Sequence, residues 1–438
     1  MEIYCPRSCG FCDDDSPEVR LHVEKVSLAG VDFQVLSARG VRHWHFFELP
    51  VARGDPAAGS CGSEEEEERS ADAAVAGSSS RSSSSSRCEA APASGAAVAM
   101  QTHAAMAHYY DGRSHIVNSW VYRWSAGARA FEEHQALPST GAWDLASFQL
   151  GGEWYLAVAS FFDGHSRTLN STIYRWVVGA DAFILHQELP TVGAMDVEFF
   201  TVNASSQDAA TSQAAFLAFT GNHDGRGAPG AECAIFRWNG ATFEEFQKLA
   251  ISGGYDAEAF QVHGADVVVL VVVNEDSADV YRASTASLLA PAPSAGRGNG
   301  RQAHQPRGFE LLQRLDVPHG RDAKHFRAEG VEHLALAVFR DDTSHRVDSP
   351  IYRWSQERQR LEEVQRLKTL GASDVELLEA GGEPLLLVAN QWSGVSALHA
   401  WGSGGWKEAG GIATPRVYDL AWHRVNASDV DLLGVASF

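Results

Sequence analysis

Four short segments recur along the chain in a fixed order, and this repeat limits the possible folds more than any other feature. One copy reads GAMDVEFFT (193–201), FLAFTG (216–221), IFRW (235–238) and FEEFQKL (243–249). Each segment is apolar at alternate positions or throughout and is rich in β-branched and aromatic residues, as β-strands are. No stretch between the turns sustains a helical period. A unit of four strands that repeats about every 50 residues is typical of a β-propeller blade.

Seven copies of this unit can be counted. The segment with a central Asp returns at residues 141–149, 253–261, 320–328, 371–379 and 416–424. The chain ends after the first two strands of the last copy, and residues 32–50 align with the last two strands of the copy at 172–190. We therefore predict an all-β fold, a seven-bladed β-propeller of four-stranded antiparallel blades, whose last blade is completed by N-terminal strands within residues 32–50. Blade one is expected at about residues 95–137, with an inner strand that lacks the Asp.

The propeller is expected to span residues 31–438, after a linker at residues 13–30. Two inserts interrupt it, at residues 51–94 and 284–308. The first contains runs of Glu and Ser, and the second mixes Pro, Gly, Ala and Arg. Such segments have too few apolar side chains to form a core, so we predict that both leave the ring as flexible loops.

Cysteines crowd at the start of the chain. Cys5, Cys9 and Cys12, in CPRSCGFC, resemble the last third of a ShKT domain, a small disulfide-stapled module. The resemblance implies disulfide bonds to three earlier cysteines. We therefore expect residues 1–12 to be the C-terminal part of such a module and the N-terminus to be incomplete. A zinc half-site formed by Cys9 and Cys12 is the alternative.

Several features predict a secreted protein or one displayed on the cell surface. Crowded cysteines are typical of oxidising compartments. N-glycosylation sequons begin at Asn170, Asn203 and Asn426. The opening residues, MEIYCPRSCGFC, lack the apolar segment of a signal peptide, which agrees with an internal start.

The repeat resembles the EAR, or EPTP, repeat. The matching elements are Phe-x-x-x-Gln-x-Leu, Gly-Ala-x-Asp-Val-Glu, an apolar strand ending in Ala-Asn or Ala-Ser, and Ile-Tyr-Arg-Trp, and they are clearest at residues 189–200 and 370–390. The resemblance covers about residues 30–438. The family includes leucine-rich glioma-inactivated proteins and thrombospondin-type laminin G/EAR-repeat proteins. It implies an extracellular module that recognises a protein ligand or the ectodomain of a cell-surface receptor.

Other functions are disfavoured by what the sequence lacks. It has no HExxH, GxSxG, phosphate-loop or dinucleotide-binding motif, so we expect no enzyme activity. The net charge of −21 disfavours nucleic acid and anionic membranes as partners, and no apolar stretch is long enough to span a bilayer. The alternatives are a glycan-binding, lectin-like propeller and a hydrolase with a site at the channel mouth.

Carboxylates recur at matching positions of the Asp-bearing segments. Because residues i and i+2 share a strand face, the symmetry of a propeller should bring these groups together near the central channel. Carboxylates at close range need a counter-charge, and Ca²⁺, which prefers oxygen ligands, would supply it. The structural alternative is that each Asp accepts backbone N–H bonds from the turn beside it. The candidate Ca²⁺ ligands are Asp144, Asp196, Glu198, Asp256, Glu258, Asp322, Asp374, Glu376 and Asp419.

Overall fold

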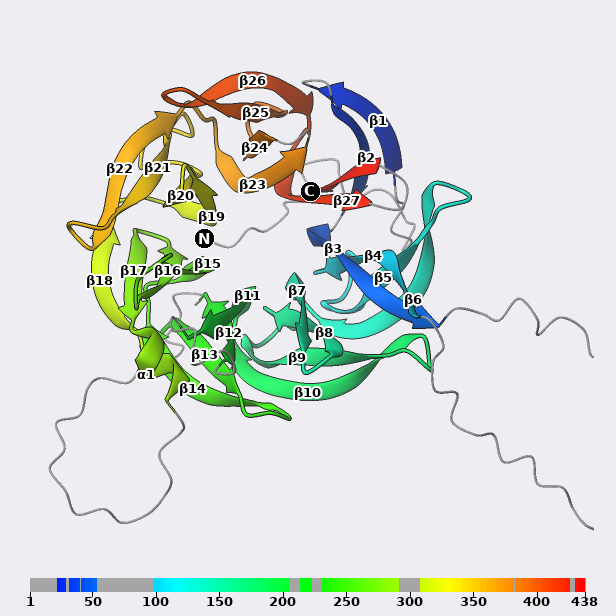
Figure 1. Cartoon of the computed structure of the whole chain (residues 1–438). Coiled ribbons are helices and arrows are strands. Elements are labelled where there is room, and N and C mark those ends of the chain that lie inside the picture. The colour runs from blue at the N-terminus through cyan, green and yellow to red at the C-terminus, as the bar shows by residue number, and fades with distance from the viewer. Residues whose placement is uncertain are drawn as a thin grey trace, which may run out of the picture.

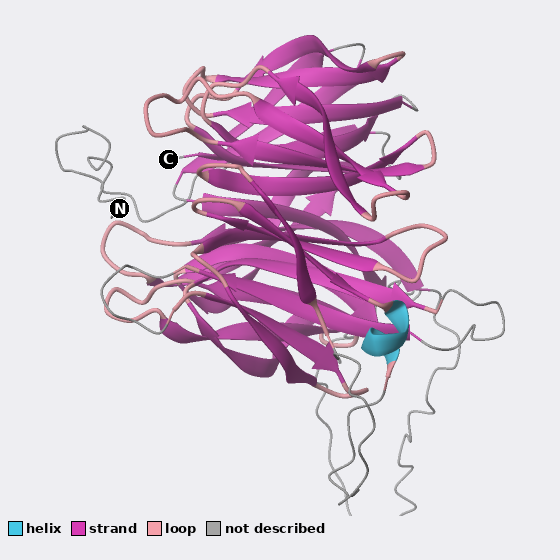
Figure 2. Ribbon diagram, turned by 90° about the vertical axis from the view of Figure 1, so that its left-hand side faces the viewer, coloured by secondary structure: helices cyan, strands magenta, loops and turns pink. Residues whose placement is uncertain are grey.

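The strands form seven four-stranded sheets arranged as a ring around a central channel (Figure 1). This computed structural model describes residues 22–28, 31–39, 41–52, 98–204, 213–222, 230–290, 308–380, 383–425 and 430–437. Each sheet is one blade, and the side view shows neighbouring sheets lying face to face (Figure 2). The predicted seven-bladed propeller is confirmed.

Within a blade the strands follow one another from the channel to the rim. Blade one contains β3 (Val41–Ala52), β4 (Val98–His108), β5 (Ile116–Ser125) and β6 (Ala130–Thr140), and blade two contains β7 (Ala142–Leu150), β8 (Glu153–Ser160), β9 (Thr168–Val177) and β10 (Ala182–Val192). Blade three contains β11 (Ala194–Asn203), β12 (Gln213–Gly221), β13 (Glu232–Trp238) and β14 (Phe243–Ala250), and blade four contains β15 (Gly254–Gln261), β16 (Val268–Asn274), β17 (Ala278–Ala283) and β18 (Glu310–Leu315). Blade five contains β19 (Gly320–Ala328), β20 (Val331–Val338), β21 (Ser349–Ser355) and β22 (Arg360–Leu367), and blade six contains β23 (Ala372–Ala380), β24 (Glu383–Asn390), β25 (Val395–Gly402) and β26 (Gly405–Ala413).

Blade seven closes the ring, but only partly with the residues that the sequence suggested. Its strands β27 (Val417–Val425) and β28 (Val430–Ser437) are followed outward by β2 (Val31–Arg39) and β1 (His22–Leu28). The prediction that residues 32–50 complete this blade is therefore right for 32–39 and wrong for the rest. Strand β3 is instead the inner strand of blade one, which begins well before residue 95. The sequence of β3 does not match the Asp-containing segment of the other inner strands, because His43 occupies the position of the Asp.

Two expected boundaries also change. Strand β1 lies within residues 13–30, where the sequence suggested a linker. The segment 284–308 begins with an ordered helix, α1 (Thr285–Leu289), whose first turn is capped by the Ser284 hydroxyl as it accepts the Ser287 N–H. Residues 53–94 and 291–307 lie outside the described residues, so the prediction of flexible loops stays open there. No helix in the described ranges is long and apolar enough to cross a membrane.

Apolar side chains fill the space between neighbouring blades. Each of the seven blade interfaces in the described residues contains one cluster of buried apolar residues. For example, Leu49 of β3, Leu145 of β7 and Trp176 of β9 share one cluster between blades one and two. Strand β16, VVLVVVN, is buried at every position because both faces of its sheet contact a neighbouring blade.

A glutamine on the outer strand ties one blade to the next. The side chain of Gln187 donates from Nε2 to the Phe243 carbonyl (2.8 Å) and accepts the Phe243 N–H at Oε1 (2.9 Å). The Phe-x-x-x-Gln motif of the repeat is therefore one half of an inter-blade contact, since the Gln of one blade binds the backbone at the Phe position of the next. The same pair of bonds joins Gln135 to Phe183, Gln247 to Phe309, Gln313 to Leu361 and Gln365 to Trp406.

Replacing Gln187 by Ala should lower the free energy of unfolding by about 1–3 kcal/mol, because the substitution removes both partners of the Phe243 backbone. Denaturant unfolding measures this loss. Gln149, an exposed glutamine on β7, is the matched control, and its replacement by Ala should change the stability by less than about 0.5 kcal/mol. Equal effects of the two substitutions would contradict the role given to the inter-blade glutamine.

Candidate functional site

All seven inner strands carry a β-bulge near their first residues. A bulge re-aims side chains, and here the bulged residue and the residue after it both line one cavity of about 220 Å³ at the channel. We call the face of the ring where the inner strands begin the entry face. We call the bulged residues the collar: Arg42, Trp143, Met195, Tyr255, Arg321, Ser373 and Tyr418.

Two rings of mostly polar side chains follow the collar into the channel. The residues directly after the bulge form the upper ring: His43, Asp144, Asp196, Asp256, Asp322, Asp374 and Asp419. The residues two positions further form the lower ring: His45, Ala146, Glu198, Glu258, Lys324, Glu376 and Ala421. The structure thus brings all nine predicted carboxylates to the channel wall.

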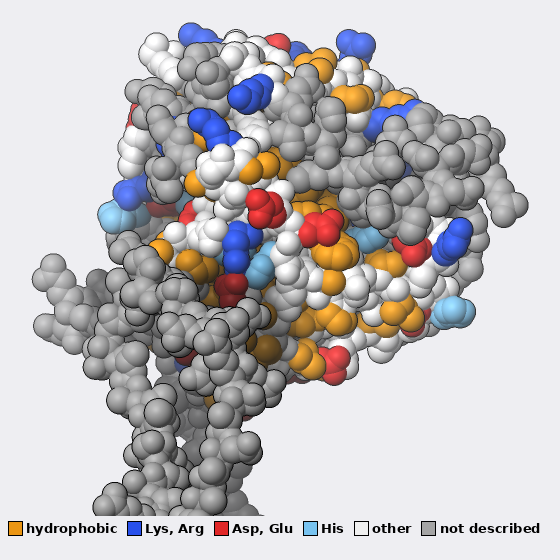
Figure 3. Space-filling model, turned by 90° about the vertical axis from the view of Figure 1, so that its right-hand side faces the viewer, with side chains coloured by type: hydrophobic (Ala, Val, Ile, Leu, Met, Phe, Trp, Pro, Cys, Tyr) orange, Lys and Arg blue, Asp and Glu red, His pale blue; other side chains and the backbone are white. Residues whose placement is uncertain are grey.

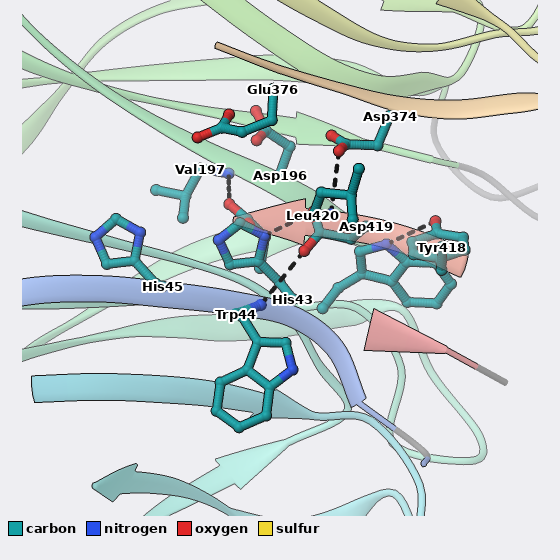
Figure 4. A network of polar contacts seen from close by, with 12 residues as sticks. His43, Trp44, His45, Asp196, Val197, Asp374, Glu376, Tyr418, Asp419 and Leu420 are labelled. Carbon is teal, nitrogen blue, oxygen red and sulfur yellow. Dashed lines mark hydrogen bonds and ion pairs between the residues drawn. The ribbon is translucent and has the colours of Figure 1, made fainter. Parts of the chain in front are cut away.

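Each upper-ring Asp joins its blade to the next one. Asp374 Oδ2, for example, accepts the Leu420 N–H of blade seven at 3.0 Å (Figure 4). The alternative to a Ca²⁺ site was that each Asp accepts backbone N–H bonds from the turn beside it. The Asp residues do accept backbone N–H bonds, but the donor lies on the inner strand of the neighbouring blade. The corresponding bonds run from Val197 to Asp144, from Ala257 to Asp196, from Ala323 to Asp256, from Val375 to Asp322 and from Trp44 to Asp419.

His43 fills the seventh position of the upper ring. Its Nδ1 lies 3.0 Å from Asp419 Oδ1 and 3.2 Å from Asp144 Oδ1, so it contacts both neighbouring blades (Figure 4). Burial lowers the pKa of His43, but the two carboxylates more than offset this effect and raise it to about 9. The imidazole is therefore a cation at neutral pH, built into the ring between blades seven and two.

The lower ring repeats this inter-blade contact with other chemistry. Glu258 Oε1 accepts the His325 N–H at 2.9 Å, and His45 Nε2 accepts the Ser147 N–H at 2.9 Å. Burial, and then the nearby His43 and Lys324, lower the pKa of His45 to about 3, so it keeps the lone pair that accepts this bond. Lys324 Nζ lies 2.9 Å from Glu376 Oε2 and is the second cation within the two rings, after His43.

Burial and crowding favour the neutral form of several ring carboxyls. Burial, followed by repulsion from Asp256 and other carboxylates, raises the pKa of Asp196 well above its ordinary value. The pKa of Glu198 is raised in the same way, with Glu258 as the main neighbour. Burial also raises the pKa of Asp322 and of Glu258 to about 7, although Lys324 opposes the rise. The channel therefore carries more carboxyls than its own cations neutralise.

The chemistry of the ring oxygens suits Ca²⁺, which binds carboxylates. As the side chains stand, however, no three His, Cys, Asp or Glu groups in the described ranges lie close enough together to hold one ion. A cation here would need the carboxyl groups to move or water to complete its shell. The predicted Ca²⁺ site therefore stays a prediction.

Aromatic rings and arginines surround the channel mouth. The Arg42 guanidinium lies 4.3 Å from the ring centroid of Trp143, 5.0 Å from that of Tyr109 and 5.1 Å from that of Tyr418. On another side of the mouth, Arg321 lies 4.0 Å from the Tyr255 centroid. Such cation–π contacts hold both the rings and the arginines in place.

From each arginine a row of aromatic side chains, in edge-on, tilted or stacked contact with one another, leads away from the mouth. The first row, which we call the Arg321 stack, continues through Phe339 (4.9 Å), His345 and Trp392, with ring centroids 4.9 Å and 4.5 Å apart. It ends in an indole that is 59% exposed.

The second row, the Arg42 stack, continues from Tyr109 through His115 to Tyr110, with centroid distances of 4.6 Å and 4.5 Å. Its last ring is 40% exposed. Sequence reasoning missed both stacks. The signal was present in the aromatic residues of the loops YYDGRSH (109–115) and FRDDTSH (339–345), but only the bulges and the ring closure align them with the mouth.

Of the remaining predicted sites, the structure describes only some. Asn170 and Asn203 are both exposed, as acceptors of a glycan must be. Asn426 lies outside the described residues, as do Cys5, Cys9 and Cys12. Cys233 is a buried free cysteine.

The melting temperature without metal should fall as the pH rises from 7 to 9, whereas below pH 7 the lowered pKa of His45 opposes this trend. A group whose pKa is raised by folding stabilises the fold below its unfolded pKa, and this stabilisation is lost as the pH rises through the folded pKa. For Glu258 and Asp322 this stabilisation is lost between about pH 4 and about pH 7. For His43 it is lost between about pH 6.5 and about pH 9. Thermal unfolding in chelator at several pH values measures the profile.

In that series, Glu258→Gln should flatten the profile between pH 5 and 7. Exposed Glu132 offers a control, since Glu132→Gln removes a carboxylate that lies outside the channel. A melting temperature that rises from pH 7 to pH 9 in the unsubstituted protein would contradict the assignment of raised pKa values.

If Ca²⁺ binds the ring carboxylates, it should raise the melting temperature, because an ion that binds only the folded state stabilises it by about 2.7 kcal/mol at a hundredfold excess over its Kd. Mg²⁺ should substitute poorly, since it requires a tighter shell. Asp196→Asn should abolish the response, whereas Asp342→Asn should keep it, because Asp342 is 98% exposed at a loop. A melting temperature that is the same in Ca²⁺ and in chelator would remove the metal from the channel.

Comparison with known proteins identifies the same repeat as the sequence analysis did. Residues 130–177, 182–239 and 308–355 match the family model of the EPTP domain. The chain is similar to the thrombospondin-type laminin G domain and EAR repeat-containing protein of Mus musculus, with 28% identity over 239 residues, which are 41% of this chain and 34% of that protein. It is also similar to leucine-rich repeat LGI family member 3 of Mus musculus, with 38% identity over 92 residues, 19% of this chain and 15% of that protein.

This chain therefore spans at most 34% of the length of these two relatives. Among solved structures, the periplasmic gluconolactonase of Pseudomonas aeruginosa is similar over 72% of this chain and 83% of its own, with a TM-score of 0.46 and 14% identity. The three matched segments show that the chain contains repeats of the EPTP type, and parts of the chain are similar to EAR-repeat and LGI proteins.

Proposed function

We propose that this chain is an extracellular recognition module without catalytic activity, which binds a protein such as the ectodomain of a cell-surface receptor on its entry face. The observation that carries the proposal is Trp392, a large apolar side chain that is 59% exposed and yet held in a fixed position. Exposed aromatic residues of this kind are the usual anchors of protein interfaces.

The seat of Trp392 is built from its neighbours. Gly371 has a φ of 64°, and a Cβ added there would lie 2.2 Å from Trp392 Cδ1, so only glycine leaves room for the indole. The Gly371 N–H donates to the His345 carbonyl (2.7 Å), and the His345 ring stacks on Trp392. An aromatic side chain that is already ordered loses little conformational entropy on binding.

The rest of the entry face supports the same use. Tyr110, 40% exposed, ends the Arg42 stack as Trp392 ends the Arg321 stack. Aromatic residues and arginine are the types enriched at the centres of interfaces. On the side of the ring seen in Figure 3, by contrast, acidic, basic and apolar side chains are interspersed, and the coloured side chains there form no broad basic surface for nucleic acid.

The raised pKa values of Glu258 and Asp322 are the feature that favours the hydrolase alternative. Each of these carboxyls, however, already accepts a backbone N–H of the next blade, at 2.9 Å in both cases. Burial and neighbouring carboxylates raise these pKa values, and both carboxyls already serve as acceptors between blades, which supports the absence of catalysis. The exposed sequon residues Asn170 and Asn203 support an extracellular location.

A binding screen tests the proposal. The labelled propeller is applied to cells that each display one receptor ectodomain, and in parallel to a glycan array. We expect binding to one or a few ectodomains, with Trp392→Ala weakening it by about 2 kcal/mol, roughly thirtyfold. Leu185→Ala is the matched control, because Leu185 is 60% exposed on β10 at the outer rim.

Two results would overturn this proposal. Binding to glycans alone would favour the lectin-like alternative. Ectodomain binding that is unchanged by Trp392→Ala, by Tyr110→Ala and by both together would show that the partner does not use the entry-face stacks.

A further inference from the structure

The part of blade seven formed by β1 and β2, residues 22–39, which we call the strap, is attached differently from the outer half of every other blade. In the other six blades each strand pairs antiparallel with the strand before it in sequence. The strap comes from the opposite end of the chain, and β2 lies parallel to β28, with Phe33 opposite Asp431 and Arg39 opposite Ser437. Parallel pairing is slightly less stable per residue than antiparallel pairing.

The strap also lacks the two-bond glutamine contact found at five other interfaces. Toward blade one, Gln34 Nε2 donates to the Arg129 carbonyl at 3.2 Å. Toward blade six, the outer strand β26 reads GWKEAGGIA and contains no glutamine. In this one contact, the rim side of blade seven differs from the five interfaces that have the two-bond glutamine.

The inner half of the same blade is tied tightly. Asp419 contacts His43, and Leu420 donates to Asp374 at 3.0 Å. Gly434 of β28 lies against Trp44, where an added Cβ would come within 2.7 Å of Trp44 Cβ. Strands β27 and β28 therefore have contacts with both neighbouring blades that do not involve the strap.

The strap has a specific seat. Phe33, Val35 and Leu36 are buried, the first two among residues of blades six and seven such as Leu387 and Val435, and Leu36 beside Trp44. We propose that the strap leaves this seat while the rest of the ring stays folded, and that a second copy of this chain can place its own strap there. The second copy is the occupant because its Phe33, Val35 and Leu36 fill the same positions, so the exchanged and the unexchanged seats have the same contacts.

Hydrogen exchange followed by mass spectrometry tests the opening. Amides of β2 should exchange at least about tenfold faster than those of β10 (Ala182–Val192), because a segment that opens locally is less protected than one that opens only with the whole ring. Equal protection of the two strands would overturn the proposal.

Cross-linking tests the exchange between copies. Ser37 lies opposite Val435, so a chain with both Ser37→Cys and Val435→Cys should form a disulfide within itself on oxidation. Two differently tagged proteins, one with Ser37→Cys and the other with Val435→Cys, are then mixed at high concentration and oxidised. We expect a disulfide-linked pair that carries both tags and that is absent when either protein is oxidised alone, which controls for native cysteines.

Circular dichroism confirms that each single variant is folded before mixing. If the double variant cross-links within itself but the mixture gives no pair with both tags, the strap does not exchange. If the double variant fails to cross-link, β2 does not lie on β28 in the register described, and the proposal fails as well.

Discussion

The structure depends on one contact that is repeated around the channel, in which the carboxylate of an inner strand accepts a backbone N–H from the inner strand of the next blade. Each blade is a separate sheet with its own backbone pairing, so apolar packing alone would leave neighbouring inner strands without polar ties. Asp374 and Leu420 show the contact in its simplest form, at 3.0 Å. The same arrangement collects negative charge at the axis, and His43 and Lys324 offset part of it within the protein.

The bulge before each of these carboxylates connects the architecture to the proposed function. It brings the carboxylate to the channel wall and, one residue earlier, turns a collar side chain to the mouth. The carboxylates are committed to holding the blades together, whereas the collar is free to differ from blade to blade. In this chain the collar contains Arg42 and Arg321, and each orders a row of aromatic rings that ends at the surface. In each inner strand, therefore, one position holds the blades together and the position before it can vary in the side chain that it presents at the mouth.

The sequence predicted the number of blades, the four-stranded unit and the carboxylates of the channel, because these repeat with little change. It predicted poorly where the repeat changes. Strand β3 was assigned to the wrong blade because His43 replaces the Asp that marks the other inner strands. The stacks were missed for another reason: Trp392 and His345 are 47 positions apart, and their contact depends on how two blades meet. The role of Gln187 likewise needed the register between blades.

The account's central claim is that the upper-ring carboxylates act first as hydrogen-bond acceptors between blades. Comparing Asp374→Asn with Asp374→Ala by denaturant unfolding in chelator tests it most directly. The amide keeps an oxygen for the Leu420 N–H and removes one charge, so its stability should equal or exceed that of the original protein. Alanine removes the acceptor and should lower the free energy of unfolding by about 1–3 kcal/mol. Equal destabilisation by both substitutions would contradict the claim, because it would show that the negative charge, and not the acceptor, is what the ring requires.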